Sequence, residues 1–376
     1  MKQHFEIIFQ TLYDVGRAVQ VEAVAQRFPA ARPLSFQKWR DTPESLLLPL
    51  PLIVPLESGD LELPEGWSSV ILQAKVYEEG VITLECRLNI TGELTELHRI
   101  RHTPLSQKGR ELTTDQLIHA QFRQFRDQID DLIALDPEAS DKIEREQYRL
   151  FCLVDPVRDP AGFVEEHQAY LAPFLLGEDP DDVLHASQVN LTLKTPFSFH
   201  EDDLAIFDLD RAFLINPRRD YEDLVLILEH ANYQLLELRV LDKLLDSWLD
   251  EASRVLRRTG KNRARFELNP LRSLSRLSQK IGRLQGLRLD ALFLLENLEN
   301  SSRIIGDYYL EQVYDHLCLM FNTQGWKRNI ERRLELLENI YTMTKSDSSE
   351  RTMVLLELIV VLMIGLEIVA LFFPPH

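Results

Sequence analysis

Residues 220–258 read DYEDLVLILEHANYQLLELRVLDKLLDSWLDEASRVLRR, and this stretch sets the architecture of the second half of the chain. Its apolar residues recur at steps of three and four, which is the spacing of a helix that packs along one side against other helices. Thr259, Gly260 and Lys261 then break the pattern. The apolar stripe consists of Leu224, Leu228, Ala231, Leu235, Leu238, Leu241, Leu245 and Trp248.

Further helical stretches follow this one along the chain. Pro270 opens a stretch that extends to Leu284, and Ile304–Met320 forms the next. The last begins near Trp326 and runs toward the carboxyl end with the same apolar spacing. Together these helices predict a long-helix coiled-coil stalk over residues 218–350.

The first 217 residues have the pattern of a mixed α and β body. Val70–Tyr77 and Val81–Ile90 predict a hairpin whose turn is Glu78, Glu79 and Gly80. The order β-α-β-β occurs twice, which predicts an α+β fold with two such units, in residues 1–140 and 141–217. The other predicted strands are 5–13, 147–154, 189–195, 204–207 and 212–215, the predicted helices are 21–28, 112–135 and 160–176, and the Pro-rich residues 29–66 are expected to be irregular.

Residues 353–373 read MVLLELIVVLMIGLEIVALFF and form the most apolar stretch of the chain. A bilayer core of about 30 Å needs about 20 helical residues, so this segment predicts one membrane-spanning helix, from Met353 to Phe373, within a C-terminal anchor of residues 351–376. Lys345 and Arg351 precede it, which places the body on the cytoplasmic side. The alternative is a buried core helix that closes a globular domain.

Two glutamates, Glu357 and Glu367, interrupt this apolar segment together with Gly365. An isolated carboxylate deep in lipid costs roughly 2–4 kcal/mol, so a lone helix would carry a penalty that a cluster of identical helices avoids. We therefore expect a homo-oligomer formed through this helix. The alternative is a monomer in which both carboxyl groups are protonated or reach the interface.

Composition limits the classes of partner and compartment. The formal net charge is −18, which disfavours binding of the whole surface to nucleic acid or anionic lipid. Three cysteines, Cys86, Cys152 and Cys318, make no disulfide framework and indicate a reducing compartment. The amino-terminal residues lack the features of a signal peptide or a transit sequence.

One region departs from the acidic average. Residues 254–288 contain eleven basic residues and a single acid, Glu267. This basic patch is either a solvated helical tip that pairs with the acidic body, or a contact for phosphates of lipid or RNA, for the ribosome, or for an acidic partner. Its members are Arg254, Arg257, Arg258, Lys261, Arg263, Arg265, Arg272, Arg276, Lys280, Arg283 and Arg288.

Two motifs resemble the domain of unknown function 155 family, also called the required-for-meiotic-nuclear-division family. LEHANYQLLELRVLDKLLD at 228–246 is similar to its motif helix, and LELIVVLMIGLEIV at 356–369 is similar to its membrane helix, with Glu357 and Glu367 matching. The resemblance covers about residues 145–373 and implies a membrane-anchored, oligomeric protein without an established catalytic activity. The lack of a transit sequence favours the plasma membrane of a bacterium as the location. The matching residues of the motif helix are Glu229, Ala231, Asn232, Gln234, Glu237, Leu238, Arg239 and Asp242.

No constellation in the sequence indicates a reaction. Phosphate-loop, dinucleotide, zinc-protease and serine-hydrolase motifs are missing, so we expect no enzyme and no cofactor. His200–Asp203, with Asp208 and Asp210, are acidic enough for a hard cation but are typical of polar turns. Along the motif helix Glu229, Asn232, Leu236 and Arg239 share one stripe, which indicates either a register-fixing polar layer or a ligand site.

Three functions are consistent with these patterns. The first is a membrane-anchored oligomeric scaffold with no catalytic activity. The second is a factor that tethers RNA or the ribosome to the membrane through the basic patch. The third is an oligomeric channel whose membrane glutamates line a pore, although the G-M-N signature of CorA-type channels is missing.

Overall fold

The computed structural model describes residues 2–16, 18–34, 50–134, 143–179, 182–261, 308–340 and a few single positions beyond them, with side chains to residue 250 in the long helix. The chain divides into two compact units. Unit 1 comprises residues 1–237 and 299–324, and unit 2 comprises 238–298 and 325–376.

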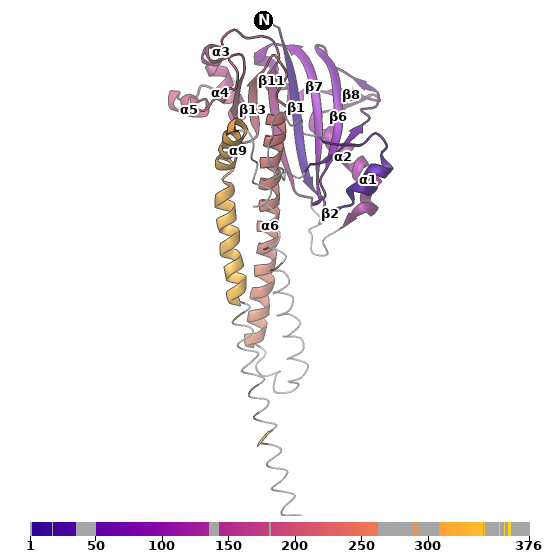
Figure 1. Cartoon of the computed structure of the whole chain (residues 1–376), viewed down its shortest axis with the longest axis vertical. Helices are drawn as coiled ribbons and strands as arrows, with labels where there is room; N and C mark the ends of the chain where they lie inside the picture. The colour runs from indigo at the N-terminus through magenta and orange to yellow at the C-terminus, as the bar shows by residue number, and fades with distance from the viewer. Residues whose placement is uncertain are drawn as a thin grey trace, which may run out of the picture. The chain divides into compact units, whose positions relative to one another are not determined.

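Unit 1 is built on one eight-stranded sheet, in which β13, β11, β1, β7 and β6 lie side by side (Figure 1). β1 lies centrally and pairs antiparallel with β7 and with β11, while β11 pairs parallel with β13. The order across the sheet is β12(Leu204–Phe207), β13(Arg211–Ile215), β11(Arg145–Leu153), β1(Gln3–Asp14), β7(Val81–Gly92), β6(Trp67–Val76), β4(Leu52–Leu56) and β3(Arg32–Pro33).

Smaller elements of unit 1 connect and flank the sheet. β2(Ala18–Val19) pairs with β10(Ile133–Ala134), and β8(Leu105–Gln107) pairs with β5(Leu61–Glu62) and β9(Arg110–Leu112). The helices are α1(Val21–Arg27), η1(Leu94–His102), α2(Thr114–Ile129), η2(Asp130–Leu132), α3(Pro160–Glu166), α4(Gln168–Leu176), α5(Ala186–Thr192), the start of α6(Glu222–Lys261) and α9(Tyr308–Met320).

The two faces of the sheet bury different cores because side chains alternate along each strand. Ile7 and Phe9 of β1 belong to a core that includes residues of α2 and α4, where Tyr13 stacks on Phe122 at a ring distance of 3.6 Å. Ile8 lies on the opposite face, in a core that includes α6 and α9. The amino-terminal half of α6 therefore covers the face of β1 that carries even-numbered residues.

Most predicted elements are confirmed, including the hairpin, where Val76 pairs with Ile82 across the predicted turn. Three predictions are wrong. Residues 160–176 form two helices, α3 and α4, which are separated at His167, instead of one helix. Residues 189–195 form no strand, and α5 covers most of them, because neither face of this segment is buried. Leu52–Leu56 is a strand within the region expected to be irregular. Its Pro55 is tolerated because only the two-residue β3 pairs with the outer side of β4, at Ile53 and Leu52.

The two predicted β-α-β-β units do not form two separate sheets. Strands from residues 1–140 and 141–217 form one continuous sheet. In addition, β1 is antiparallel to β7, whereas the corresponding strands β11 and β13 are parallel. The supported fold class is accordingly a mixed α/β body with one large sheet and helices.

Unit 2 contains the second part of α6 and helical residues 325–340. Their apolar positions are buried, with exposures of 0–5% for Leu238, Leu245, Ile330 and Leu334. Arg333 Nε lies 3.2 Å from Asp242 Oδ1, which joins the two helices. The predicted apolar stripe is thus confirmed where it is described, and the stalk as a whole stays a prediction.

The predicted membrane anchor lies almost entirely outside the described residues. Of its residues, Met353, Glu357, Val360 and Val361 are described as helical and exposed. Gly365, Glu367 and Phe373 are not described. Among the helices that the structure describes, none combines the length and hydropathy needed to cross a bilayer.

Candidate functional site

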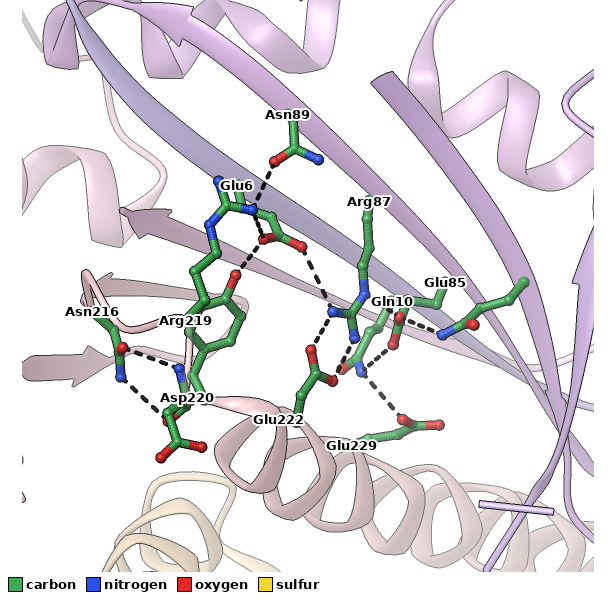
Figure 2. Close-up of polar contacts among 12 residues, drawn as sticks. Glu6, Gln10, Glu85, Arg87, Asn89, Asn216, Arg219, Asp220, Glu222 and Glu229 are labelled. Atoms are coloured by element: carbon green, nitrogen blue, oxygen red, sulfur yellow. Dashed lines mark hydrogen bonds and ion pairs between the residues drawn. The ribbon is translucent and has the colours of Figure 1, made fainter. Parts of the chain in front are cut away.

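A layer of charged side chains lies between the sheet and the start of α6 (Figure 2). The even-numbered residues Glu6 and Gln10 of β1 point to this side, next to Lys75 of β6 and to Glu85 and Arg87 of β7. The strands therefore present polar side chains on the face that α6 covers, while their alternate residues fill the apolar core.

The most deeply buried part of this layer is a triad of Lys75, Glu85 and Glu229. Lys75 is 4% exposed, and both carboxylates are fully buried. The Lys75 Nζ lies 2.7 Å from Glu85 Oε2 and also binds Glu229 Oε2. Tyr77 donates a hydrogen bond of 2.8 Å to Glu229 Oε1, and Gln10 Nε2 donates to Glu229 and Glu85 at 3.2 and 3.3 Å.

The layer continues along the helix through Arg87. Its Nε donates to Glu85 Oε1 at 2.6 Å, and its Nη2 donates to Glu222 Oε2 at 2.8 Å. Glu6 Oε1 lies 3.6 Å from the same guanidinium, and Tyr221 donates to Glu6 Oε2 at 2.5 Å. Glu222 and Glu229 are two helical turns apart, so both contact the sheet from one face of α6.

The electrostatics favour ionised side chains in this buried layer. Burial alone would raise the pKa of Glu85, but the charges of Lys75 and Arg87 and their hydrogen bonds outweigh it and lower this pKa to about 2. For Lys75, burial would lower the pKa, and the attraction of Glu229 and Glu85 raises it instead. Burial raises the pKa of Tyr77 well above its ordinary value, as does the adjacent Glu229 charge.

This arrangement binds one structural element to another. Each carboxylate of the triad is held by an ammonium, guanidinium, phenol or amide donor from the sheet, as buried ions require. A side chain engaged in this way cannot approach a substrate unless the layer opens. The chemistry available to the charged layer is therefore the attachment of α6 to β1, β6 and β7.

Comparison with known proteins places the body of the chain in a family. Residues 4–222 match the family model described as "Uncharacterized protein MJ0711, N-terminal domain". The chain belongs to this family. The MJ0711 N-terminal domain thus includes all eight strands of the sheet and the sheet residues of the charged layer, and the match ends at Glu222, before Glu229.

A curated relative is "Uncharacterized protein MJ0711" of Methanocaldococcus jannaschii, which is 28% identical over 224 residues. The match covers 60% of this chain and 65% of the relative, slightly less than two thirds of that protein's length. No solved structure matches the chain. The comparisons support a domain of unknown function, but they do not support the naming as a domain of unknown function 155 protein.

The residues predicted from the motif helix follow the matched MJ0711 domain in the chain, and they lie at separate places along α6. Glu229 joins the triad, whereas Asn232 Nδ2 donates to the Leu228 carbonyl at 3.1 Å. Gln234 accepts a hydrogen bond of 2.6 Å from Tyr314 of α9. Asp242 binds Arg333 within unit 2, and Arg239, also in unit 2, is partly buried. The structure therefore favours the register-fixing interpretation of this motif over one ligand site.

Glu237 is the one residue of this motif with a strongly shifted carboxyl group. Burial, together with the nearby charges of Asp14 and Glu79, raises its pKa to about 8. A carboxyl group with this pKa keeps its proton at neutral pH, although the Glu237 side chain is only partly buried. Glu237 is the last residue of unit 1 on α6.

The acidic turn of the MJ0711 domain is occupied by local contacts. Asp203 accepts hydrogen bonds from the backbone N–H groups of Phe199 and His200 at 2.8 and 3.1 Å, and Asp202 pairs with Arg218 at 3.0 Å. In the part of the chain that the structure describes, no group of three or more His, Cys, Asp or Glu residues is arranged to hold a metal ion.

The basic patch lies largely outside the described residues. Arg254, Arg257, Arg258 and Lys261 belong to α6, but their side chains are not described, and Arg263–Arg288 are not described at all. What this patch binds stays a prediction.

Sequence reasoning found Glu229 and missed its partners on the sheet. The signal was present in the hairpin, where Gln73, Lys75, Glu85 and Arg87 occupy alternate positions on two paired strands. Such alternation ordinarily indicates a solvated face. In the folded protein α6 covers this face through contacts between residues that are more than 130 positions apart in the sequence. Local sequence patterns do not reveal such contacts.

Proposed function

We propose that this protein is a non-enzymatic, membrane-anchored oligomeric scaffold whose body lies on the cytoplasmic side of the plasma membrane. The single observation that carries the proposal is the attachment of α6 to the sheet through Glu229, Lys75 and Glu85. The most polar constellation of the body holds an α-helix of 40 residues in place, and that helix leads out of unit 1.

A charged layer suits a scaffold better than it suits a catalyst. Buried ion pairs contribute little net stability compared with apolar packing, but they penalise every arrangement that leaves a charge unpaired. The layer therefore favours one position of α6 on the sheet. A protein that must present a helix in one register gains from such a layer.

The membrane part of the proposal rests on the sequence of residues 353–373. This stretch has the length and hydropathy of a spanning helix. Its similarity, and that of residues 228–246, to the domain of unknown function 155 family supports an anchored, oligomeric protein, and both stretches lie beyond the matched residues 4–222. Glu357 and Glu367 are expected to meet equivalent residues of other copies.

Fractionation and crosslinking of the full chain test this proposal. We expect the chain to stay with membranes after alkaline carbonate washing and to give crosslinked multimers in native membranes, whereas a chain ending at residue 350 is released. Glu367→Gln should alter the multimer pattern, and the exposed Glu311→Gln in α9 is the matched control. Release of the full chain by carbonate, or a purely monomeric pattern, contradicts the proposal.

A second candidate function is favoured by the local charge of residues 254–288, with eleven basic residues in an acidic chain. A tether for RNA or for the ribosome would use this basic patch through its attraction to phosphates. Replacing Arg272, Arg276 and Arg283 by Gln should then weaken co-sedimentation with ribosomes at low salt and make the remaining binding less dependent on salt, because fewer counterions are released. Unchanged co-sedimentation would rule this candidate out and leave the scaffold proposal intact.

A further inference from the structure

A small cavity of about 120 Å³ lies in unit 1, where the loop between β13 and α6 meets the first residues of α9. Residues of β12, of β13 and of the first turn of α6 also line it. Its volume is about four times the roughly 30 Å³ that one water occupies in the liquid. The cavity is therefore too small for a whole cofactor, but it has room for a group of about four non-hydrogen atoms.

The lining of this cavity is acidic on its exposed side and apolar where it is buried. Asp203, Asp220 and Asp223 contribute three carboxylates, whereas Leu214 is buried. Among the described residues that line the cavity, none is lysine or arginine, and His200 is the one side chain that protonation could make positive. The amino-terminal end of α6 contributes about half a positive charge, which the carboxylates exceed. The cavity therefore attracts a cation.

Asp220 is the carboxylate of this lining that has capacity for a new partner. The two arginines that precede it in the chain are engaged elsewhere, because Arg218 pairs with Asp202 at 3.0 Å and Arg219 pairs with Glu6 at 3.4 Å. Figure 2 shows the Asp220 carboxylate pointing away from the Arg219 guanidinium. Within the part of the chain that the structure describes, this carboxylate takes part in no hydrogen bond or ion pair, since the contacts of Asp220 are made by its backbone.

The loop that carries Asp220 is held in one conformation. Asn216, which is buried and lines the cavity, accepts a hydrogen bond of 3.2 Å from the Asp220 backbone N–H. The side-chain amide of Asn216 also donates to the Asp220 carbonyl at 3.3 Å. Arg219 between them has a left-handed backbone with a φ of 56°, which a residue other than glycine adopts only when its surroundings impose it. Asp220 is thus fixed beside the cavity before any ligand arrives.

Two aromatic rings form another part of the wall. The ring centres of Phe199 and Tyr309 are 5.3 Å apart, and the rings are inclined at 55°. Phe199 is 61% exposed, so a ligand can reach its ring from the solvent. Aromatic faces attract cations that lie within about 6 Å of the ring centre, and guanidinium groups most often. Carboxylates together with an aromatic face suit a planar guanidinium, whose edge donates hydrogen bonds and whose faces stack.

The arrangement of the acidic groups favours such an organic cation over a bare metal ion. In the described ranges of the chain, no three His, Cys, Asp or Glu side chains are grouped closely enough to hold a metal. Calcium and magnesium need oxygen ligands at about 2.0–2.6 Å. A guanidinium spreads its charge over a planar group with five N–H donors, so it can bridge carboxylates that lie farther apart.

We propose that this cavity binds a guanidinium group, of a free small molecule or of an arginine side chain, with its N–H donors on Asp220 and Asp203 and one face on Phe199. Asp203 keeps acceptor capacity, because each of its oxygens accepts one backbone N–H and a carboxylate has about four acceptor sites. Asp223 adds its charge, although it already takes part in another interaction. The proposal is independent of the membrane anchor and of the scaffold function.

Saturation-transfer NMR of defined probes with the full chain in detergent tests the proposal. Methylguanidinium carries the charge, and methylurea has nearly the same shape without it. We expect methylguanidinium to bind with a Kd below about 10 mM, and methylurea not to bind in that range. N-acetylargininamide distinguishes the two sources of the group. Tighter binding than methylguanidinium identifies an arginine side chain of a partner, and weaker binding identifies a free small molecule.

Three variants at exposed positions separate binding from folding, and each should keep its melting temperature. Asp220→Asn should weaken methylguanidinium binding about five- to tenfold, because hydrogen bonds to charged groups are roughly twice as strong as neutral ones. Phe199→Leu should weaken it about two- to fivefold through loss of the aromatic face. The matched control Asp127→Asn, in α2, removes the same charge and should leave binding unchanged.

Several results would overturn the proposal. These are no binding of methylguanidinium, equal binding of methylurea, equal losses in Asp220→Asn and Asp127→Asn, or unchanged affinity in both Asp220→Asn and Phe199→Leu.

Discussion

Replacement of Lys75 by Met is the sharpest perturbation of the charged layer. The side chains have similar length, so the change removes the ammonium while it largely preserves the packed volume. The carboxylates of Glu85 and Glu229, both fully buried, would then face each other without the cation between them. Glu85 would retain Arg87 at 2.6 Å, whereas Glu229 would retain, within the part of the chain that the structure describes, only the neutral donors of Tyr77 and Gln10.

The expected loss of unfolding free energy follows from these contacts. Removal of one partner of a buried ion pair destabilises a protein by about 3–5 kcal/mol, and two carboxylates share this cation, which places Lys75→Met in the upper part of that range. Glu229→Gln leaves Lys75 paired with Glu85 at 2.7 Å and should cost less, about 1–3 kcal/mol. The double variant should cost less than the sum of both, with a coupling of at least about 1 kcal/mol.

Urea unfolding followed by circular dichroism measures these free energies, and hydrogen exchange locates the effect in β6 and residues 222–237. The matched control is Arg27→Met, which breaks a solvent-screened pair with Asp131 at 2.7 Å and should change the unfolding free energy little. The reasoning is refuted if Lys75→Met costs no more than this control, or if the effects of Lys75→Met and Glu229→Gln simply add.

Three further outcomes follow from the described residues. The pKa of Glu237 is about 8, above its ordinary 4.5. Its proton therefore stabilises the folded state at low pH, and this contribution is lost as the pH rises from about 4.5 to 8. Glu237→Gln should raise the unfolding free energy at pH 9 by on the order of 1–3 kcal/mol and change it little near pH 4. Burial raises the pKa of the Cys86 and Cys152 thiols, so a thiol reagent should label both only after unfolding, and rapid native labelling would count against their burial. Arg333→Gln, which breaks the contact with Asp242, should lower the melting temperature of unit 2 by a few degrees, in line with about 1 kcal/mol for a partly exposed pair.

The sequence predicted the elements of the fold well where local periodicity was strong. The hairpin of β6 and β7 and the helix α6 follow from alternation and from apolar spacing, which depend on residues close in the chain. The strand predicted for residues 189–195 was wrong because the alternation of apolar and polar residues there does not correspond to a buried face. The assembly into one sheet depended on pairing of β1 with β11, between residues as much as 148 positions apart, which no local pattern encodes.

The candidate site was predictable only from its helical side. Glu229 stood out because a charge on an apolar helix requires a partner. Its partner Lys75 looked like an ordinary solvent-facing strand residue, since a polar face reads the same whether water or another element covers it. The neighbouring arginines Arg149 and Arg211 were missed for a related reason: they come together only through the parallel pairing of β11 and β13.

The spacing of the glutamates on α6 explains why this contact is ionic. Glu222 contacts Arg87 and Glu229 contacts Lys75, two helical turns further along. A slide of α6 by one turn, about 5.4 Å, would bring Val225 or Tyr233 opposite Lys75 and leave a buried ammonium with one partner fewer. An apolar contact would tolerate such a slide at small cost, because one leucine packs much like another, whereas each broken ion pair costs several kcal/mol. The layer thus fixes the register of α6 on the sheet, which apolar packing alone would leave poorly defined.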